Sequence, residues 1–352
     1  MEWISLALFS AALFGVITAL EKRLIDHHLP NLGVYYASIA YSLLIPAAIV
    51  FFATGGVPDE ATNLNMGWAA RSGGTWGVGL AMVFWGYKLE EASRASAIVH
   101  TFPVFVAIFA AFTLNESLIP GQWAAIIVIV AGAFVISIRR SGGPGVLSFS
   151  RAFPILIIAS LLTALSHIFA KAALDDGLTV WMTYAIRATA MAVAFGVLAK
   201  PKGFFEMLAV LRNWRTLTLM LSADFLMAPV ASISLTRATE LGAISLVAAM
   251  AATRPFFVFL VSSLFSIEKI NLLNETLHRD TLLLTVISLP MLVPRFATLS
   301  LLYFLLPPLR PPFPSCLFRF LYLGFFLLFF LFSSSSFHVP SLSPPLYLFF
   351  PL

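Results

Sequence analysis

Three charged residues lie well inside long apolar segments of the sequence: Arg187, Asp224 and Arg254. A charge at the centre of a bilayer costs about 2.5–3.5 kcal/mol on insertion scales, so each should face the protein interior and find a partner. Asp224 is the acidic residue that we expect at a depth comparable to the two arginines. The pattern allows two interpretations: an arginine that binds an anionic substrate group when Asp224 releases it, or a permanent structural ion pair.

Two prolines interrupt apolar segments at corresponding places in the two halves of the chain. Pro103 lies in Ala-Ile-Val-His-Thr-Phe-Pro-Val-Phe-Val from Ala97 to Val106, and Pro255 lies in the segment from Leu246 to Val258. A proline near the middle of a helix frees the carbonyl four residues earlier, which protein or a wet cavity must then receive. Repeated breaks of this kind point to the binding site of a transporter. A tolerated kink in a packed helix bundle explains them equally well.

His100 and Trp85 complete the set of candidate cavity residues. His100 precedes Pro103 by three residues, so it could bind a substrate or relay protons, or simply hydrogen-bond a neighbouring helix. Trp85 closes an apolar segment, where it could stack on a substrate ring or belong to an interfacial aromatic belt. The candidate substrate-cavity residues are therefore Trp85, His100, Pro103, Arg187, Asp224, Arg254 and Pro255.

The composition requires an all-α integral membrane protein to position these residues. Sixty per cent of the 352 residues are hydrophobic and 11% are charged, whereas an ordinary soluble domain carries about 25% charged residues. We expect the first apolar segment to span the membrane, because it lacks the basic start and the cleavage site of a signal peptide. Blocks of about 20 apolar residues predict ten spans: 3–20, 32–53, 73–88, 95–114, 122–138, 154–174, 179–199, 216–236, 243–265 and 281–306.

The basic residues are distributed very unevenly between the two membrane faces. Thirteen of them fall in the odd-numbered loops of this scheme, and the even-numbered loops and their margins hold only Arg71, Lys171 and Arg237. Basic loops favour the cytoplasm, so the bias alone places the N-terminus outside. This pattern is usual in a polytopic membrane protein, so the net charge of +5 requires no nucleic-acid partner.

The predicted spans fall into two halves of five. A Gly/Ser-rich linker over 141–153 separates a first repeat, 1–140, from a second repeat, 154–285. Because five is an odd number, the second half must enter the membrane in the opposite direction, which makes the repeats inverted.

The segment after the second repeat, 286–352, has an aberrant, low-complexity composition. Phe, Leu, Pro and Ser account for 54 of the 72 residues from Thr281 to Leu352, with no Asp, Glu or Lys. Those four residue types share pyrimidine-rich codons, so a frameshift soon after Leu284 would explain the tail. A genuine but divergent membrane tail is the alternative.

Several segments together resemble the EamA family of the drug/metabolite transporter superfamily. They are Glu90-Glu-Ala-Ser-Arg-Ala-Ser-Ala-Ile, Pro103-Val-Phe-Val, Glu116, Gly121-Gln-Trp-Ala-Ala and Ala131-Gly-Ala-Phe-Val-Ile-Ser, with echoes from Ala238 to Ser245 and in Pro255-Phe-Phe-Val. The resemblance covers about 1–285 and implies ten helices in two inverted repeats around a central cavity. It implies that the third, fourth, eighth and ninth helices, roughly 73–114 and 216–265, line the path of a small metabolite.

Two features depart from the family pattern. The glutamate that follows the ninth helix has two candidates, Glu268 by its spacing from the proline and Glu275 by its Leu-Asn-Glu context. Family members usually keep both termini in the cytoplasm, whereas the basic residues here favour the reverse orientation.

The sequence favours a membrane transporter of a small organic metabolite that works by alternating access. We expect no catalytic residues, no cofactor and no metal, because no phosphate loop, HExxH motif, cysteine pair or nucleophile elbow occurs. Partners would be the substrate and the bilayer, with proton or solute counter-transport left open, in the plasma (inner) membrane of a prokaryote. The alternatives are an integral membrane enzyme acting on a lipid-linked substrate, or a truncated, non-functional transporter product.

Overall fold

The computed structural model describes residues 2–89, 95, 98–116, 120, 123, 139–140, 147–148, 151–254, 257–258 and 261. All of them belong to one compact unit, Met1–Met291. Within this part the chain is helical, apart from a two-residue antiparallel ladder between β1 (Arg139–Arg140) and β2 (Leu147–Ser148). Five helices are long and apolar enough to cross a membrane. The predicted all-helical class of integral membrane protein is therefore confirmed.

The described part of the first half contains four α-helices and one π-helical turn. Asn31 begins the second helix as a cap, because its side-chain oxygen accepts a hydrogen bond from the Val34 N–H. The elements are α1 (Glu2–Arg23), η1 (Leu24–His28), α2 (Leu32–Ala53), α3 (Asn63–Leu89) and α5 (Phe102–Thr113).

The second half is described from α7 to α11. Thr179 caps α8 in the way that Asn31 caps α2, accepting from the Met182 N–H. The long apolar segment that starts at Trp214 changes from α-helix to π-helix and back, so three elements form one span. The elements are α7 (Phe153–Asp175), α8 (Val180–Leu211), α9 (Trp214–Met220), η2 (Leu221–Met227), α10 (Ala228–Leu241) and α11 (Ile244–Ala251).

Two helices extend beyond the limits that hydropathy predicts. α3 begins ten residues before the predicted span 73–88, because buried Asn65 is satisfied there by hydrogen bonds to the carbonyls of Glu60 and Asp176. α8 continues past residue 199 after a kink at Lys200. The predicted tenth span, and the fifth apart from residue 123, lie outside the described residues, as do both glutamate candidates and the tail.

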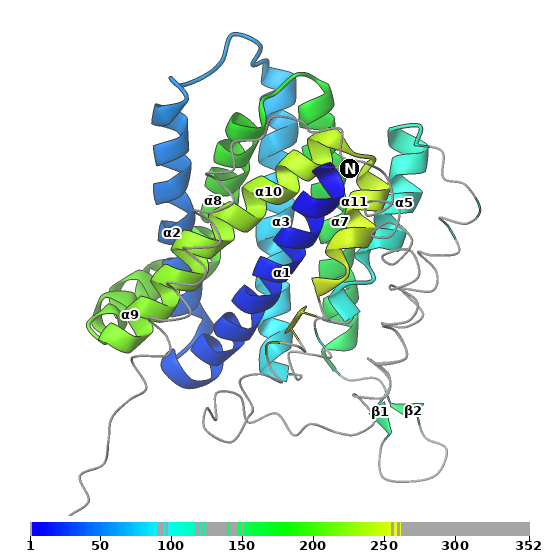
Figure 1. Ribbon diagram of the computed structural model, residues 1–352. Helices are drawn as coiled ribbons and strands as arrows, with labels where there is room; N and C mark the ends of the chain where they lie inside the picture. The colour runs from blue at the N-terminus through cyan, green and yellow to red at the C-terminus, as the bar shows by residue number, and fades with distance from the viewer. Residues whose placement is uncertain are drawn as a thin grey trace, which may run out of the picture. The chain divides into compact units, whose positions relative to one another are not determined.

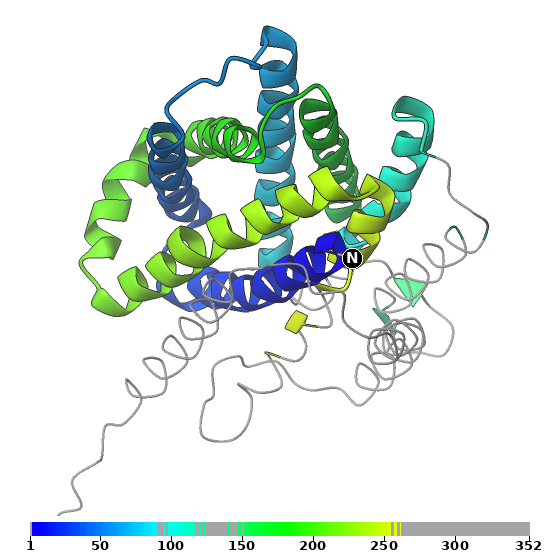
Figure 2. The same cartoon turned by 45° about the horizontal axis from the view of Figure 1, so that its top comes forward.

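The helices pack around α3, α7 and α8 (Figures 1 and 2). α2 packs along α8, α3 packs against both α7 and α8, and α1 packs against α10. Gly73 allows the closest approach, since a Cβ added there would lie 2.2 Å from the Arg187 carbonyl oxygen. Small residues at such crossings are the usual means by which membrane helices come together.

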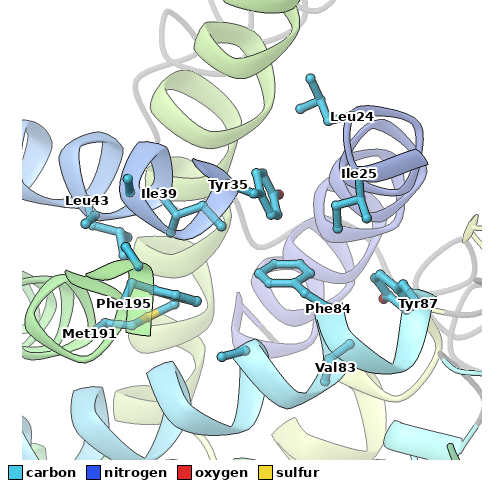
Figure 3. Close-up of a cluster of buried hydrophobic side chains, with 14 of the residues drawn as sticks. Leu24, Ile25, Tyr35, Ile39, Leu43, Val83, Phe84, Tyr87, Met191 and Phe195 are labelled. Carbon is cyan, nitrogen blue, oxygen red and sulfur yellow. The ribbon is translucent and has the colours of Figure 1, made fainter. Parts of the chain in front are cut away.

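Aromatic side chains from three helices fill the core at one end of the bundle (Figure 3). The Phe84 ring from α3 meets the Tyr35 ring from α2 edge-on, with centroids 4.9 Å apart, and lies 6.2 Å from the Phe195 ring of α8. Large apolar side chains such as Phe52 and Phe112 are exposed on the outside. That outward apolar surface is the surface that a bilayer covers.

A carboxylate of the first half caps a helix of the second half. Glu116 accepts hydrogen bonds from the Ile244 and Ser245 N–H groups, at 2.7 and 3.2 Å, and from the Ser245 hydroxyl at 2.7 Å. An anion at a helix N-terminus satisfies unpaired donors and complements the helix dipole. Glu116 therefore joins the end of α5 to the start of α11.

Candidate substrate cavity

Polar and aromatic side chains converge on a cavity of about 50 Å³ between the two halves. Ligand pockets in proteins usually reach about 300–1,000 Å³, so this cavity is smaller than a metabolite site requires. The lining residues are Phe14, Thr18, Glu21, Trp76, Leu80, Val83, Tyr87, Val99, His100, Phe102, Thr163, His167, Leu235 and Arg254.

Helical periodicity brings the lining residues of α1 and α3 to one side of each helix. Phe14, Thr18 and Glu21 follow one another at four and three positions, which places them on a single face of α1. α3 presents a similar row that begins at Trp76 and ends at Tyr87. The cavity therefore runs along both helices toward the end of α1.

The two proline segments end in the same local structure at the cavity. In the first, the N–H and the Oγ1 of Thr101 both donate to the Ile98 carbonyl, at 3.2 and 2.8 Å. In the second, the N–H and the Oγ1 of Thr253 both donate to the Met250 carbonyl, at 3.1 and 2.8 Å. Each threonine stands two residues before its proline, so the two halves repeat the turn as well as the sequence.

The position of Pro103 differs from the prediction of a single helix over 95–114. The chain turns at His100–Thr101, and α5 begins at Phe102 with Pro103 in its first turn. The missing N–H of a proline costs no hydrogen bond there. Pro255, the corresponding residue of the second half, lies outside the described residues.

The residues just before the two prolines both face the cavity but differ in chemistry. Phe102 supplies an aromatic ring, and Arg254 supplies a cation in the equivalent position of the second half. The Arg254 guanidinium carbon lies 4.2 Å from the centroid of the Phe14 ring. A desolvated cation–π contact of this kind is worth about 2 kcal/mol or more.

Glu21 links Arg254 to a second buried carboxylate, Asp224, because Glu21 interacts electrostatically with both. Asp224 lies in the π-helical segment η2, and its Oδ2 atom is buried without a hydrogen-bond partner among the described residues. Asp224 is not among the cavity-lining residues, and it forms no direct ion pair with Arg187 or Arg254 in the described part of the chain.

Arg187 is not among the cavity-lining residues, but it contacts Trp76, which is one of them. Its guanidinium donates to Thr236 and Ser166, both at 3.3 Å, and lies 4.8 Å from the centroid of the Trp76 ring. These contacts tie α8 to α10, α7 and α3. The Nε atom of Arg187 is buried without a partner in the described structure.

The two histidines at the cavity contact the same aromatic ring. His167 stacks on Phe102 with centroids 5.2 Å apart, and His100 meets Phe102 edge-on at 5.8 Å. Both histidines are buried. Phe102 therefore fixes an imidazole from α7 beside the turn that precedes Pro103.

Trp85, which the sequence assigns either to the cavity or to an interfacial aromatic belt, lies outside the cavity lining, whereas Glu21, which the sequence does not single out, lies within it. Trp85 is 50% exposed on α3 and is not among the cavity-lining residues. Glu21 lies in the last turn of α1 and is buried, although it follows the predicted first span, 3–20. Its spacing from Phe14 and Thr18 is the sequence signal that identifies it as part of the cavity face.

No group of three or more His, Cys, Asp or Glu side chains within the described residues could hold a metal ion. The ionisable groups at the cavity suit the binding of a charged or polar organic solute.

The fold and the cavity define a polytopic helical membrane protein with an internal polar site. Residues 1–138, less than half of the chain, match the EamA-like transporter family, which confirms the predicted resemblance over that segment.

Comparison with other proteins adds a likeness in fold. No curated protein matches the chain. A solved structure described only as "Crystal structure of protein" is similar, with a TM-score of 0.54 and 14% identity over 83% of this chain and 97% of that chain. At this level of identity the likeness concerns the fold alone.

Proposed function

We propose that the chain is a carrier of a small organic metabolite that works by alternating access around the cavity between its two halves. The observation that carries the proposal is that the residues next to both proline turns line one small cavity together with buried charged groups. Such turns near the midplane are where carriers of this architecture bind their substrates. The family match over 1–138 supports the same function.

The packing supports an inverted repeat of five plus five helices. Exchange of the two halves maps α1 onto α7 and α3 onto α10. The contact between α3 and α7 then corresponds to that between α10 and α1, and both contacts occur, as a pseudo-twofold relationship requires.

The proposed recognition step uses Arg254. In the cavity its charge interacts with Glu21, without a direct ion pair among the described residues. An anionic group of the substrate would bind the guanidinium by charge-assisted hydrogen bonds, which are stronger than those between neutral groups. The ring of Phe14 would keep the guanidinium pointed into the cavity.

Substrate binding at Arg254 would couple to a proton. Once a substrate engages Arg254, Glu21 would lose its cation while Asp224 still interacts with it, and like charges in a buried site repel strongly. Uptake of a proton by one carboxyl group would relieve the repulsion. Tyr35 and Tyr87 also interact with Glu21, and His100 and His167 line the same cavity.

The experiment that tests the function is an uptake and export screen with purified protein in vesicles, over amino acids, nucleosides and sugars. A carrier moves at least one solute faster than empty vesicles do, and excess unlabelled solute inhibits that movement. Vesicles that contain folded full-length protein yet move none of the three classes would contradict the proposal. Detection of full-length protein in the plasma membrane of a prokaryotic host separates a carrier from a non-functional translation product.

A further inference from the structure

α8 is divided into two parts by the kink at Lys200. From Val180 to Ala199 the helix is apolar over about 20 residues, which spans roughly 30 Å and so the hydrocarbon core of a bilayer. Lys200 then has left-handed backbone angles, φ 56° and ψ 160°, and Pro201 follows it. The helix resumes and continues to Leu211, so this second part begins at the membrane surface.

The inner side of the second part is fixed to the start of α2. A Cβ added to Gly203 would lie 2.6 Å from the Gly33 carbonyl oxygen, so the two backbones touch. The Asn31 side chain donates to Glu206 at 2.8 Å, and the Phe204 ring meets Tyr41 edge-on at 5.7 Å. In Figure 1, α9 lies at the same end of the bundle as the end of α1 and the start of α2.

The outer side of this part is both apolar and basic. Phe205, Leu208 and Trp214 are 76%, 66% and 71% exposed, among the most exposed large apolar side chains of the described structure. Four exposed cations flank them: Lys200, Lys202, Arg212 and Arg215. Glu206 is the one acidic residue from 200 to 215, and it is engaged by Asn31 and by Lys202 at 3.5 Å.

We propose that residues 200–215 lie in the plane of the membrane interface and bind anionic phospholipid headgroups. The apolar side chains would enter the boundary between headgroups and acyl chains, and the four cations would contact lipid phosphates. Aromatic and leucine side chains with Lys and Arg beside them are the composition of interfacial helices. Each basic residue near an anionic surface adds to the attraction.

The charge distribution of the whole chain supports the same ligand. The end of the bundle that carries this segment also holds Lys22, Arg23 and Lys88, whereas the opposite end exposes the acidic Asp59 and Glu60 together with Arg71 and Arg237. A basic end faces the cytoplasmic leaflet, which is where anionic lipids concentrate. The proposal does not depend on the transport function, since no residue of the segment lines the cavity.

The test uses full-length protein in nanodiscs of phosphatidylcholine alone or mixed with phosphatidylglycerol. After transfer to detergent, mass spectrometry counts the phosphatidylglycerol and phosphatidylcholine molecules that remain bound. The combined variant Lys200→Gln, Lys202→Gln, Arg212→Gln and Arg215→Gln should lose the preference for phosphatidylglycerol about tenfold. The matched control neutralises two exposed arginines at the opposite end, Arg71→Gln and Arg237→Gln, and should keep it.

A second measurement keeps the proposal testable if the fourfold variant does not fold. Brominated lipid should quench the fluorescence of Trp214, which is obtained as the difference between the wild type and Trp214→Phe. Added salt should weaken the retention of phosphatidylglycerol by the wild type. Equal retention of the two lipids by the wild type would overturn the proposal. So would unchanged lipid preference in a folded fourfold variant, or a Trp214 signal that brominated lipid does not quench.

Discussion

The guanidinium of Arg254 lies over the ring of Phe14, so the first helix of the chain meets the second proline turn inside the cavity. The equivalent turn of the first half presents Phe102, which stacks on His167 of α7. One half therefore offers a ring and the other offers a cation at matching positions. In the proposed function, this asymmetry makes Arg254 the charged recognition group of an architecture that otherwise repeats.

Replacement of Glu21 by Gln should uncouple substrate binding from proton uptake. In the wild type, binding of an anionic solute at Arg254 leaves two facing carboxylates, so transport should rise as the external pH falls. Glu21→Gln removes one carboxylate and should flatten that dependence while transport persists. The measurement is initial uptake against pH in vesicles. The matched control, Glu2→Gln at the exposed start of α1, should keep the wild-type profile; an unchanged profile in Glu21→Gln would exclude this carboxylate from coupling.

Two adjacent glycines of α3 should respond oppositely to substitution by alanine. A Cβ at Gly73 would overlap the Arg187 carbonyl oxygen, whereas a Cβ at Gly74 meets nothing within 4 Å. Gly73→Ala should therefore destabilise the fold by about 1–3 kcal/mol or more. Gly74→Ala should be neutral or stabilising by up to about 1 kcal/mol, because alanine favours the helix. Melting temperatures in detergent compare the two variants, and equal melting temperatures would contradict the close packing of α3 on α8.

Loss of the Glu116 cap should weaken the link between the halves. Glu116→Ala removes three hydrogen bonds at the start of α11 and should cost about 1–2 kcal/mol. Ser245→Ala removes one of the three and should cost less. The order of the two melting temperatures checks the prediction. If Ser245→Ala melts below Glu116→Ala, the carboxylate is not the main cap.

Much of the fold follows from hydropathy, because lipid requires each span to be a long apolar helix. The sequence predicts the centres of α1, α2, α7 and α8 for that reason. It does not predict the first ten residues of α3, where tertiary hydrogen bonds to Asn65 support polar residues that a hydropathy window excludes. The kink at Lys200 is likewise a tertiary feature, although Pro201 marks its position.

The cavity was predictable in part. The sequence names Arg254 and His100 as candidates because one is a charged residue and the other a histidine inside an apolar segment. Both line the cavity. The sequence does not predict Glu21 as a cavity residue, because a carboxylate one residue beyond a predicted span resembles an ordinary loop residue. The packing of α1 in the structure buries it. The expected ion pair of Asp224 with Arg187 or Arg254 is not formed in the described part of the chain. Such a pair depends on side-chain positions in separate helices, which sequence spacing alone does not determine.

The most direct test of the central claim compares transport by Arg254→Leu and Asp224→Asn with the wild type in vesicles, using a solute that the screen identifies. If Arg254 binds an anionic group of the substrate, Arg254→Leu should reduce initial uptake at least about tenfold, equivalent to about 1.4 kcal/mol. Arg254→Lys should retain part of the activity because it keeps the charge, and Asp224→Asn should change the apparent affinity. Wild-type uptake by both Arg254→Leu and Asp224→Asn would remove these residues from the mechanism and contradict the proposed site.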